Sequence, residues 1–157
     1  KKKLFLPQLL VSADAAKAGF EILKQSIATE TATKKGDPIV ICTVKGDIHD
    51  IGKNIVKVLL ENYGYQVIDL GKDVPPEEVV KAAQEYGARL VGLSALMTTT
   101  VGAMEETIRQ LRRTLPDCRV MVGGAVMTEE YARTIGADFY GANAVASVHY
   151  ANQLFHK

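Results

Sequence analysis

The chain has 157 residues, 47% of them hydrophobic, and its 19 basic and 18 acidic residues give a formal net charge of +1. This length suits one ordinary domain with its own core, and the balanced charge offers no broad field to attract nucleic acid or a membrane surface. The apolar runs are only as long as strands, and the chain starts with three lysines instead of an apolar leader, so we expect a soluble, cytoplasmic protein.

The first segment of the chain carries a helical pattern. Apolar residues recur at helical spacing from Leu6 to Ile27, and Pro7 falls in the first turn, where proline is tolerated. Residues 28–37 are polar, rich in threonine and lysine, and typical of a linker. We expect residues 1–35 to form a helix and a linker, and the abrupt start at Lys1 indicates a piece of a longer chain.

Residues 36–157 alternate between two patterns. Short runs rich in β-branched residues predict strands at 38–44, 65–70, 88–96, 118–124 and near 137–141. Helical spacing in the intervals predicts helices over 51–64, 75–87, about 99–115, about 128–135 and about 143–154. This alternation predicts an α/β fold, a doubly wound parallel five-stranded sheet of the flavodoxin-like or Rossmann-like kind, for which we expect the strand order 2-1-3-4-5.

Polar and glycine-rich clusters follow four of the predicted strands. They are KGDIHDIG at 45–52, SALMTTT at 94–100, GGAVMT at 123–128 and YGANA at 140–144. Because the carboxyl ends of parallel strands meet at one edge, these clusters predict a ligand site in the crevice where strand order reverses. The sequence has no dinucleotide fingerprint after the first strand and no P-loop, so nicotinamide and ATP fit poorly.

His49 lies between two carboxylates, Asp47 and Asp50. A single loop histidine can bind a metal that a macrocycle already holds, and Asp47 could fix its tautomer by accepting a hydrogen bond from the other ring nitrogen. Gly52 would let a bulky group pass close to the backbone. On these residues alone, a surface histidine that caps the following helix is an equally good interpretation.

A family resemblance favours the metal ligand. DIHDIG at 47–52 resembles the D-x-H-x-x-G signature of cobalamin-binding domains, and the wider GDIHDIGKN resembles the version in methionine synthases and corrinoid methyl-transfer proteins. SAL at 94–96 and VGGAVMT at 122–128 resemble the S-x-L and G-G elements of the family. Residues 5–23 resemble the last helix of the cap that covers the corrinoid. The resemblance implies cobalamin as cofactor, a cap remnant in residues 1–35 and a cobalamin-binding domain in residues 36–157.

The resemblance also implies roles for single residues. His49 would bind cobalt as the lower axial ligand, in place of the dimethylbenzimidazole of the cofactor, and Asp47 and Thr100 would form a relay behind it. Phe5 would lie in the cap over the reactive face. Ser94, Gly123 and Gly124 would line a slot for the benzimidazole tail. The full set of other implied cofactor contacts is Gly46, Ile48, Asp50, Ile51, Gly52, Ser94, Leu96, Thr98, Gly123, Gly124, Ala125, Tyr140 and Ala142.

The chemistry that the resemblance implies is a methyl shuttle. The domain would carry methylcobalamin between methyl-donor and methyl-acceptor modules or proteins, with a reactivation partner. Our main hypothesis is a cobalamin-dependent methyltransferase, namely methionine synthase, which transfers methyl from methyltetrahydrofolate to homocysteine.

Other hypotheses stay open. A corrinoid shuttle for methanol or methylamine donors shares every motif and is the alternative. An adenosylcobalamin mutase domain fits less well because of the IGKN continuation and the cap helix. A cobalamin-dependent sensor would add a basic, DNA-binding face, which the charge balance does not suggest. An ordinary flavodoxin-like domain without cobalamin explains the clusters least.

Overall fold

The computed structural model describes residues 36–156, so the predicted cap helix with Phe5 lies outside the described residues. Five parallel strands form one sheet, namely β1 (Pro38–Thr43), β2 (Gln66–Asp69), β3 (Leu90–Ser94), β4 (Arg119–Gly123) and β5 (Phe139–Tyr140). They pair in the order β2-β1-β3-β4-β5, which confirms the predicted order. Strand order therefore reverses between β1 and β3.

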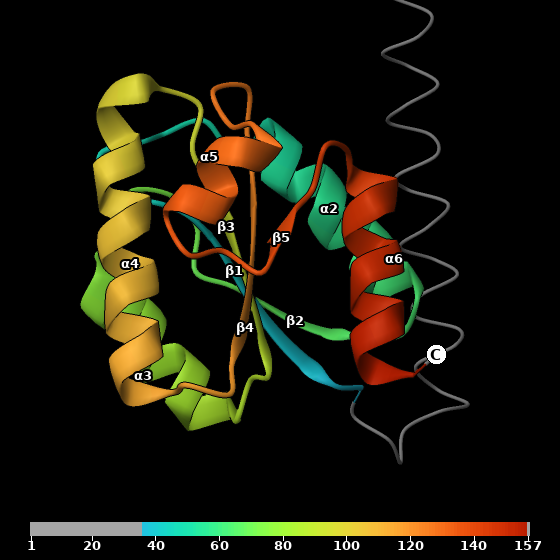
Figure 1. The fold of residues 1–157 in the computed structure, drawn as a ribbon. Helices are drawn as coiled ribbons and strands as arrows, with labels where there is room; N and C mark the ends of the chain where they lie inside the picture. Colours follow the sequence, from blue (N-terminus) through green and yellow to red (C-terminus); the bar gives the residue numbers. More distant parts are fainter. Residues whose placement is uncertain (1–35, 157) are drawn as a thin grey trace, which may run out of the picture. The chain divides into compact units, whose positions relative to one another are not determined.

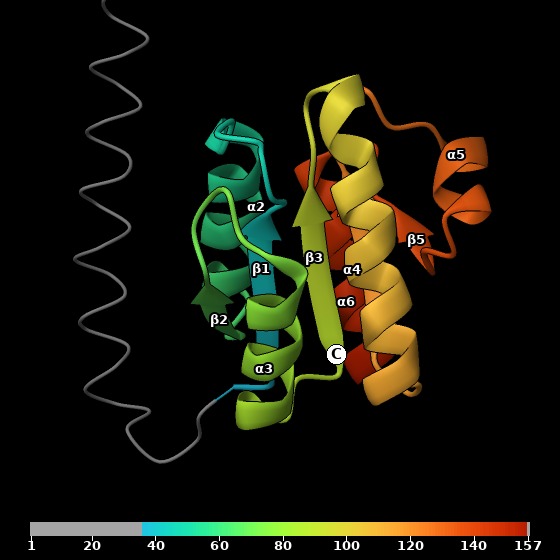
Figure 2. The same ribbon diagram turned by 90° about the vertical axis from the view of Figure 1, so that its left-hand side faces the viewer.

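Helices cover both faces of the sheet. They are α2 (Ile51–Asn62), α3 (Pro76–Tyr86), α4 (Val101–Thr114), α5 (Glu129–Thr134) and α6 (Ala144–Phe155), with a 3₁₀ turn, η1, at Thr98–Thr100. Figure 1 shows α3 and α4 on one face and α2 and α6 on the other. Figure 2, turned by 90°, shows the arrows of β1 and β3 pointing to the same edge. No helix within residues 36–156 is long and apolar enough to cross a membrane.

The sheet is buried on both faces, which explains why its strands are nearly continuous apolar runs. Val40 and Cys42 of β1 point to the α3 and α4 side, whereas Ile39 and Ile41 point to the side of α2 and α6. Cys42 and Cys118 are buried free cysteines.

The largest difference from the predicted boundaries follows β3. The predicted strand at 88–96 ends at Ser94, and the predicted helix at about 99–115 begins as the 3₁₀ turn η1. The chain leaves the sheet early because Leu96 and Met97 donate their backbone N–H groups to the carboxylate of Asp47, after β1. This contact between two loops determines the shape of the ligand edge.

Candidate functional site

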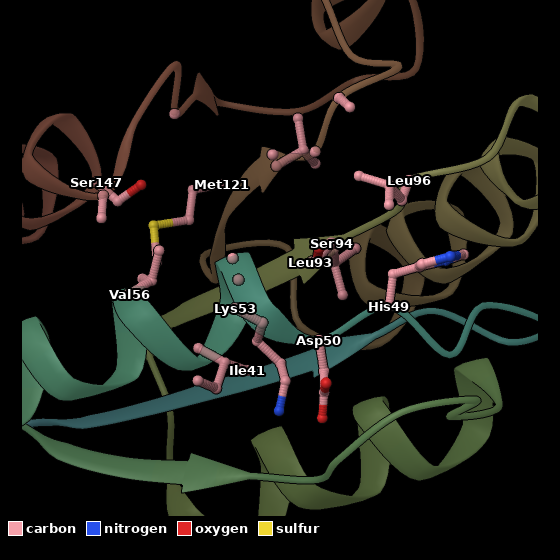
Figure 3. A pocket seen from close by; sticks show the side chains of 18 of the residues that line it. Ile41, His49, Asp50, Lys53, Val56, Leu93, Ser94, Leu96, Met121 and Ser147 are labelled. Carbon is pink, nitrogen blue, oxygen red and sulfur yellow. The ribbon is translucent and has the colours of Figure 1, made fainter. Parts of the chain in front are cut away.

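A cavity of about 580 Å³ opens at the carboxyl-end edge of the sheet, on the face that α2 and α6 cover. In Figure 3, His49 and Leu96 lie at one side of this cavity and Val56, Met121 and Ser147 at the other. Met121 lies inside β4 and Val56 lies in the second turn of α2, so the cavity extends from the strand ends down between sheet and helices. Its volume is in the range typical of small-molecule sites.

Most of the residues that the resemblance implies come together here. Those that line the cavity are Ile48, His49, Asp50, Ile51, Gly52, Ser94, Leu96, Gly123, Gly124, Ala125, Tyr140 and Ala142. Asp47 and Thr100 are buried behind His49. Gly46 and Thr98 are exposed and lie outside the lining.

Asp47 holds the imidazole ring of His49 in one orientation. Asp47 Oδ1 lies 2.8 Å from His49 Nδ1 and also accepts the backbone N–H of His49 at 3.0 Å. Because a carboxylate can only accept, Nδ1 carries the hydrogen and Nε2 of the neutral ring keeps its lone pair. The side chain of His49 is 45% exposed. Nε2 is therefore available to bind a metal from outside the sheet.

The second oxygen of Asp47 joins the loop after β1 to the loop after β3. Asp47 Oδ2 accepts the backbone N–H of Leu96 at 2.7 Å and the hydroxyl of Thr100 at 2.8 Å. Burial of the carboxylate opposes ionisation, but the hydrogen bonds from His49, Leu96 and Thr100 outweigh it and hold the pKa of Asp47 well below its usual range. Asp47 is therefore a permanent acceptor behind His49.

The helix-cap interpretation of His49 is wrong. The N-cap residue of α2 is Asp50, and no side chain caps this helix end. The ring of His49 instead bonds to Asp47, two residues earlier in the loop.

Lys53 anchors the first turn of α2 beside the cavity. Its side chain is almost fully buried, and its Nζ donates to Asp69 Oδ1 at the end of β2, at 2.6 Å. Burial works against the charge on Asp69, but the hydrogen bonds from Lys53 and from the backbone of Gly71 lower its pKa. Sequence reasoning missed this pair, because its partners lie on different elements.

Other lining residues were also missed by sequence reasoning. They are Ile41, Cys42, Val56, Gly92, Leu93, Met121, Val122 and Ser147, whereas Gly141, Asn143 and Ala144 belong to the YGANA cluster that the sequence already predicted at the ligand edge. Gly92 carried a usable signal, because an isolated glycine inside a strand indicates a close approach. A Cβ at Gly92 would lie 3.0 Å from Met121 Cε and 3.1 Å from Ile41 Cγ2. The apolar members resemble ordinary core residues in the sequence.

The single imidazole of His49 fits a metal whose other ligands belong to the cofactor that holds it. No group of three or more His, Cys, Asp or Glu side chains within residues 36–156 could hold a metal ion. A single imidazole beside a deep, mostly apolar slot suits the cobalt of a corrin ring whose tail enters the slot.

Comparison with known proteins leads to the same cofactor. The family model described as the B12 binding domain matches residues 38–149. The chain belongs to the B12-binding domain family. Cobalamin is therefore its cofactor, as the sequence motifs implied.

Relatives of this B12-binding chain include corrinoid proteins. Dimethylamine corrinoid protein 1 of Methanosarcina mazei is 45% identical over 154 residues, which are 97% of this chain and 71% of that protein. A cobalamin-binding protein from Desulfitobacterium hafniense has 35% identity and a TM-score of 0.76, with 85% of this chain and 66% of that chain covered. The methanol:cobalamin methyltransferase complex from Methanosarcina barkeri has 36% identity and a TM-score of 0.79, with 98% and 58% covered. This chain thus spans about two thirds or less of these solved chains.

Proposed function

We propose that this chain is the cobalamin-carrying part of a corrinoid methyl carrier that serves methylamine or methanol methyltransferase systems. The similarity to a dimethylamine corrinoid protein and to the methanol:cobalamin methyltransferase complex supports this proposal. The same relatives support the corrinoid shuttle, our alternative, better than the methionine synthase assignment, our main hypothesis. They also favour a carrier that works with methyltransferases over a chain that is itself the methyltransferase.

The observation that carries the proposal is the bond between His49 Nδ1 and Asp47 at the mouth of the cavity. His49 is the proposed cobalt ligand through Nε2. Bound cobalamin supplies a cobalt centre that accepts and releases a methyl group. Asp47 orients the ring, and the Thr100 hydroxyl donates to Asp47 and keeps this carboxylate in place. His49 would hold the cobalt through Nε2, and the Asp47 carboxylate beside Nδ1 would keep the ring in the orientation that this requires.

The slot is the proposed site of the benzimidazole tail. Ser94, at the end of β3, offers a hydroxyl near its mouth, and Gly123 lies beside it at the end of β4. Ile48, Ile51 and Leu96 are large apolar residues with exposed surface around the opening, and they suit the apolar part of a corrin ring. Phe5, Gly46 and Thr98 remain proposed contacts that the described cavity does not include.

The proposed partners are a methyl-donor methyltransferase, a methyl-acceptor methyltransferase and a reactivation partner. The experiment that tests the proposal starts from the chain loaded with cobalamin and chemically reduced. The reduced, loaded chain is divided into three samples. Each receives one methyltransferase, specific for dimethylamine, methanol or methyltetrahydrofolate, together with its methyl donor. We expect the absorption spectrum to report methylation of the bound cofactor with an amine or alcohol system. Methylation from methyltetrahydrofolate alone would contradict the proposal.

The ligand role of His49 is tested on the same samples. Paramagnetic resonance of the Co(II) form should show nitrogen coupling from histidine, and His49→Ala should lose it. His149→Ala, which removes an exposed histidine of α6, is the matched control and should keep the signal. An unchanged nitrogen signal in His49→Ala would remove His49 as the ligand.

A further inference from the structure

Asp73 has an unusual backbone conformation in the loop between β2 and α3. Its φ is 54°, in the left-handed region, and within residues 36–156 only His156, at the end of α6, shares this feature among non-glycine residues. Residues other than glycine adopt this region at a cost, and Asp and Asn tolerate it best. Asp73 does not line the cavity. Neither the sequence motifs nor the proposed function accounts for it.

The hydrogen bonds of Asp73 lead to the loop that presents His49. Asp73 Oδ1 accepts the backbone N–H of Gly46 at 2.7 Å. The backbone N–H of Asp73 donates to the carbonyl oxygen of Asp47 at 2.9 Å. One residue of the β2–α3 loop therefore holds two consecutive residues that lie just before His49.

Neighbouring bonds extend this contact on both sides. Thr43 donates its backbone N–H to the carbonyl oxygen of Gly71 at 2.9 Å and accepts the N–H of Val74 at 3.2 Å. The hydroxyl of Thr43 in turn donates to the carbonyl oxygen of His49 at 3.1 Å. Residues 71–74 thus run along the start of the His49 loop and support its backbone from outside the cavity.

We propose that Asp73 is a positioning residue for His49. The side chain of Asp47 is held by the loop after β3, but its backbone and that of Gly46 are held by Asp73. Gly46, with φ of 85°, has no side chain to fix its own conformation. A metal ligand must be placed to within about 0.5 Å, so the external support sets how readily His49 reaches the cobalt. The inference rests on the proposed ligand role of His49.

Two substitutions separate the possible contributions of Asp73. Asp73→Asn keeps an acceptor oxygen and tolerates the left-handed backbone, whereas Asp73→Gly tolerates the backbone but has no acceptor. Both remove the negative charge, so a difference between them reports the hydrogen bond to Gly46. Lys72→Ala, in an exposed neighbour on the same loop, is the control for changes to the loop in general.

The measurement is the ratio of histidine-bound to histidine-free Co(II) cobalamin in the loaded chain, from the nitrogen coupling in paramagnetic resonance. Loss of one hydrogen bond should lower this ratio about threefold to tenfold in Asp73→Gly. Asp73→Asn and Lys72→Ala should match the wild type. The unfolding temperature of the cobalamin-free chain should change little in all three variants, because Gly46 and Asp73 are exposed and the glycine relieves backbone strain.

The outcomes separate the positioning role from the proposed function. A wild-type ratio in Asp73→Gly would overturn the positioning role, and so would an equal loss in Asp73→Asn, which would assign the effect to charge. If the ratio of histidine-bound cobalamin falls in parallel with the unfolding temperature across the variants, the effect is purely structural, and the positioning role would also be overturned. Absence of the nitrogen signal in the wild type would instead contradict the ligand role of His49.

Discussion

Asp47 is a charged residue in a place that water does not reach, and it is stable there because each of its oxygens has hydrogen-bond donors. His49 supplies two donors to one oxygen, and Leu96 and Thr100 supply donors to the other. A buried carboxylate with this many partners rigidifies the groups around it. The residue that orients the proposed ligand therefore also fixes two loops of the ligand edge relative to each other.

Asp47→Asn tests this dual role through the pH dependence of stability. An amide cannot accept all of these hydrogen bonds, so the variant should lose about 1 to 3 kcal/mol of unfolding free energy near pH 6 for each donor left unsatisfied. The folded-state pKa of Asp47 lies below the unfolded value of about 3.9, so its stabilisation is present above pH 4 and is lost as pH falls further. The difference between wild type and variant should therefore shrink from pH 5 to pH 2. Denaturant titrations at a series of pH values measure it, and a constant difference would contradict the mechanism.

Single residues also show where prediction from sequence ends. The pairing of Asp47 with His49 could be predicted because the two residues lie close in the chain, and Thr100 came from the family resemblance. The role of Asp73 could not be predicted, because it contacts Gly46 across 27 positions of the chain. Spacing along a chain carries no information about such a contact.

At the scale of elements, the periodic patterns predicted every strand and helix of residues 36–156, because buried parallel strands and amphipathic helices differ strongly in the spacing of apolar residues. Their ends were less predictable. α4 begins after a 3₁₀ turn, because the preceding loop bonds to Asp47, and β5 has only two residues. The cavity itself lies between elements, so its inner lining, such as Met121 and Ser147, was found only in the structure.

Two glycines with different physical roles follow each other where β4 ends, Gly123 as its last residue and Gly124 as the first residue of the next loop. From the sequence, both Gly123 and Gly124 were interpreted as room for the tail. Both line the cavity, but a Cβ at Gly124 would lie 1.8 Å from the carbonyl oxygen of Ala95, and φ there is 127°. A Cβ at Gly123 would meet only Gly141 O at 3.4 Å. Gly124 is therefore required for the close approach of the loops after β3 and β4.

Alanine at each position should separate the two roles. We expect Gly124→Ala to destabilise the domain by about 2 kcal/mol or more, through backbone strain and overlap with Ala95. Gly123→Ala should change the unfolding free energy by less than about 1 kcal/mol but weaken cobalamin binding, because its methyl group enters the slot. Denaturant unfolding of the cobalamin-free chain and a cobalamin titration measure the two effects. Equal stability of the two variants would rule out this distinction.

At the scale of the whole molecule, two apolar layers lie on the two faces of the sheet, and the cofactor cavity opens on one of these faces. The layer with α3 and α4 holds the larger cluster of buried apolar residues, while the cavity lies beside Gly92 and Met121 on the side of α2 and α6. Both layers share the central strands β1, β3 and β4. A ligand that fills the cavity should therefore stabilise the sheet and, through it, the opposite layer as well.

The two cysteines can test this coupling between layers. Both are buried, and burial raises the pKa of the Cys42 thiol to about 12 and that of Cys118 to about 11. A thiol reagent attacks the thiolate, so both should react only when the domain unfolds. Both belong to the apolar layer with α3 and α4, but Cys42 also lines the cavity, whereas Cys118 does not. Single-cysteine chains, made with Cys118→Ala or Cys42→Ala, report the two places separately.

Bound cobalamin should slow labelling of both cysteines by the same factor, about 100-fold at a free concentration of 100 times Kd, if unfolding is global and faster than labelling. The equality is the decisive part of this prediction, because direct shielding by the cofactor would protect Cys42 alone. Labelling rates are compared with and without cobalamin in each single-cysteine chain, under conditions where the rate depends on reagent concentration. Protection confined to Cys42 would show direct shielding at the cavity, with the part of the α3 and α4 layer around Cys118 opening independently of the cofactor site. Equal protection would mean that the two layers unfold as one unit, so that a ligand bound in one of them stabilises both.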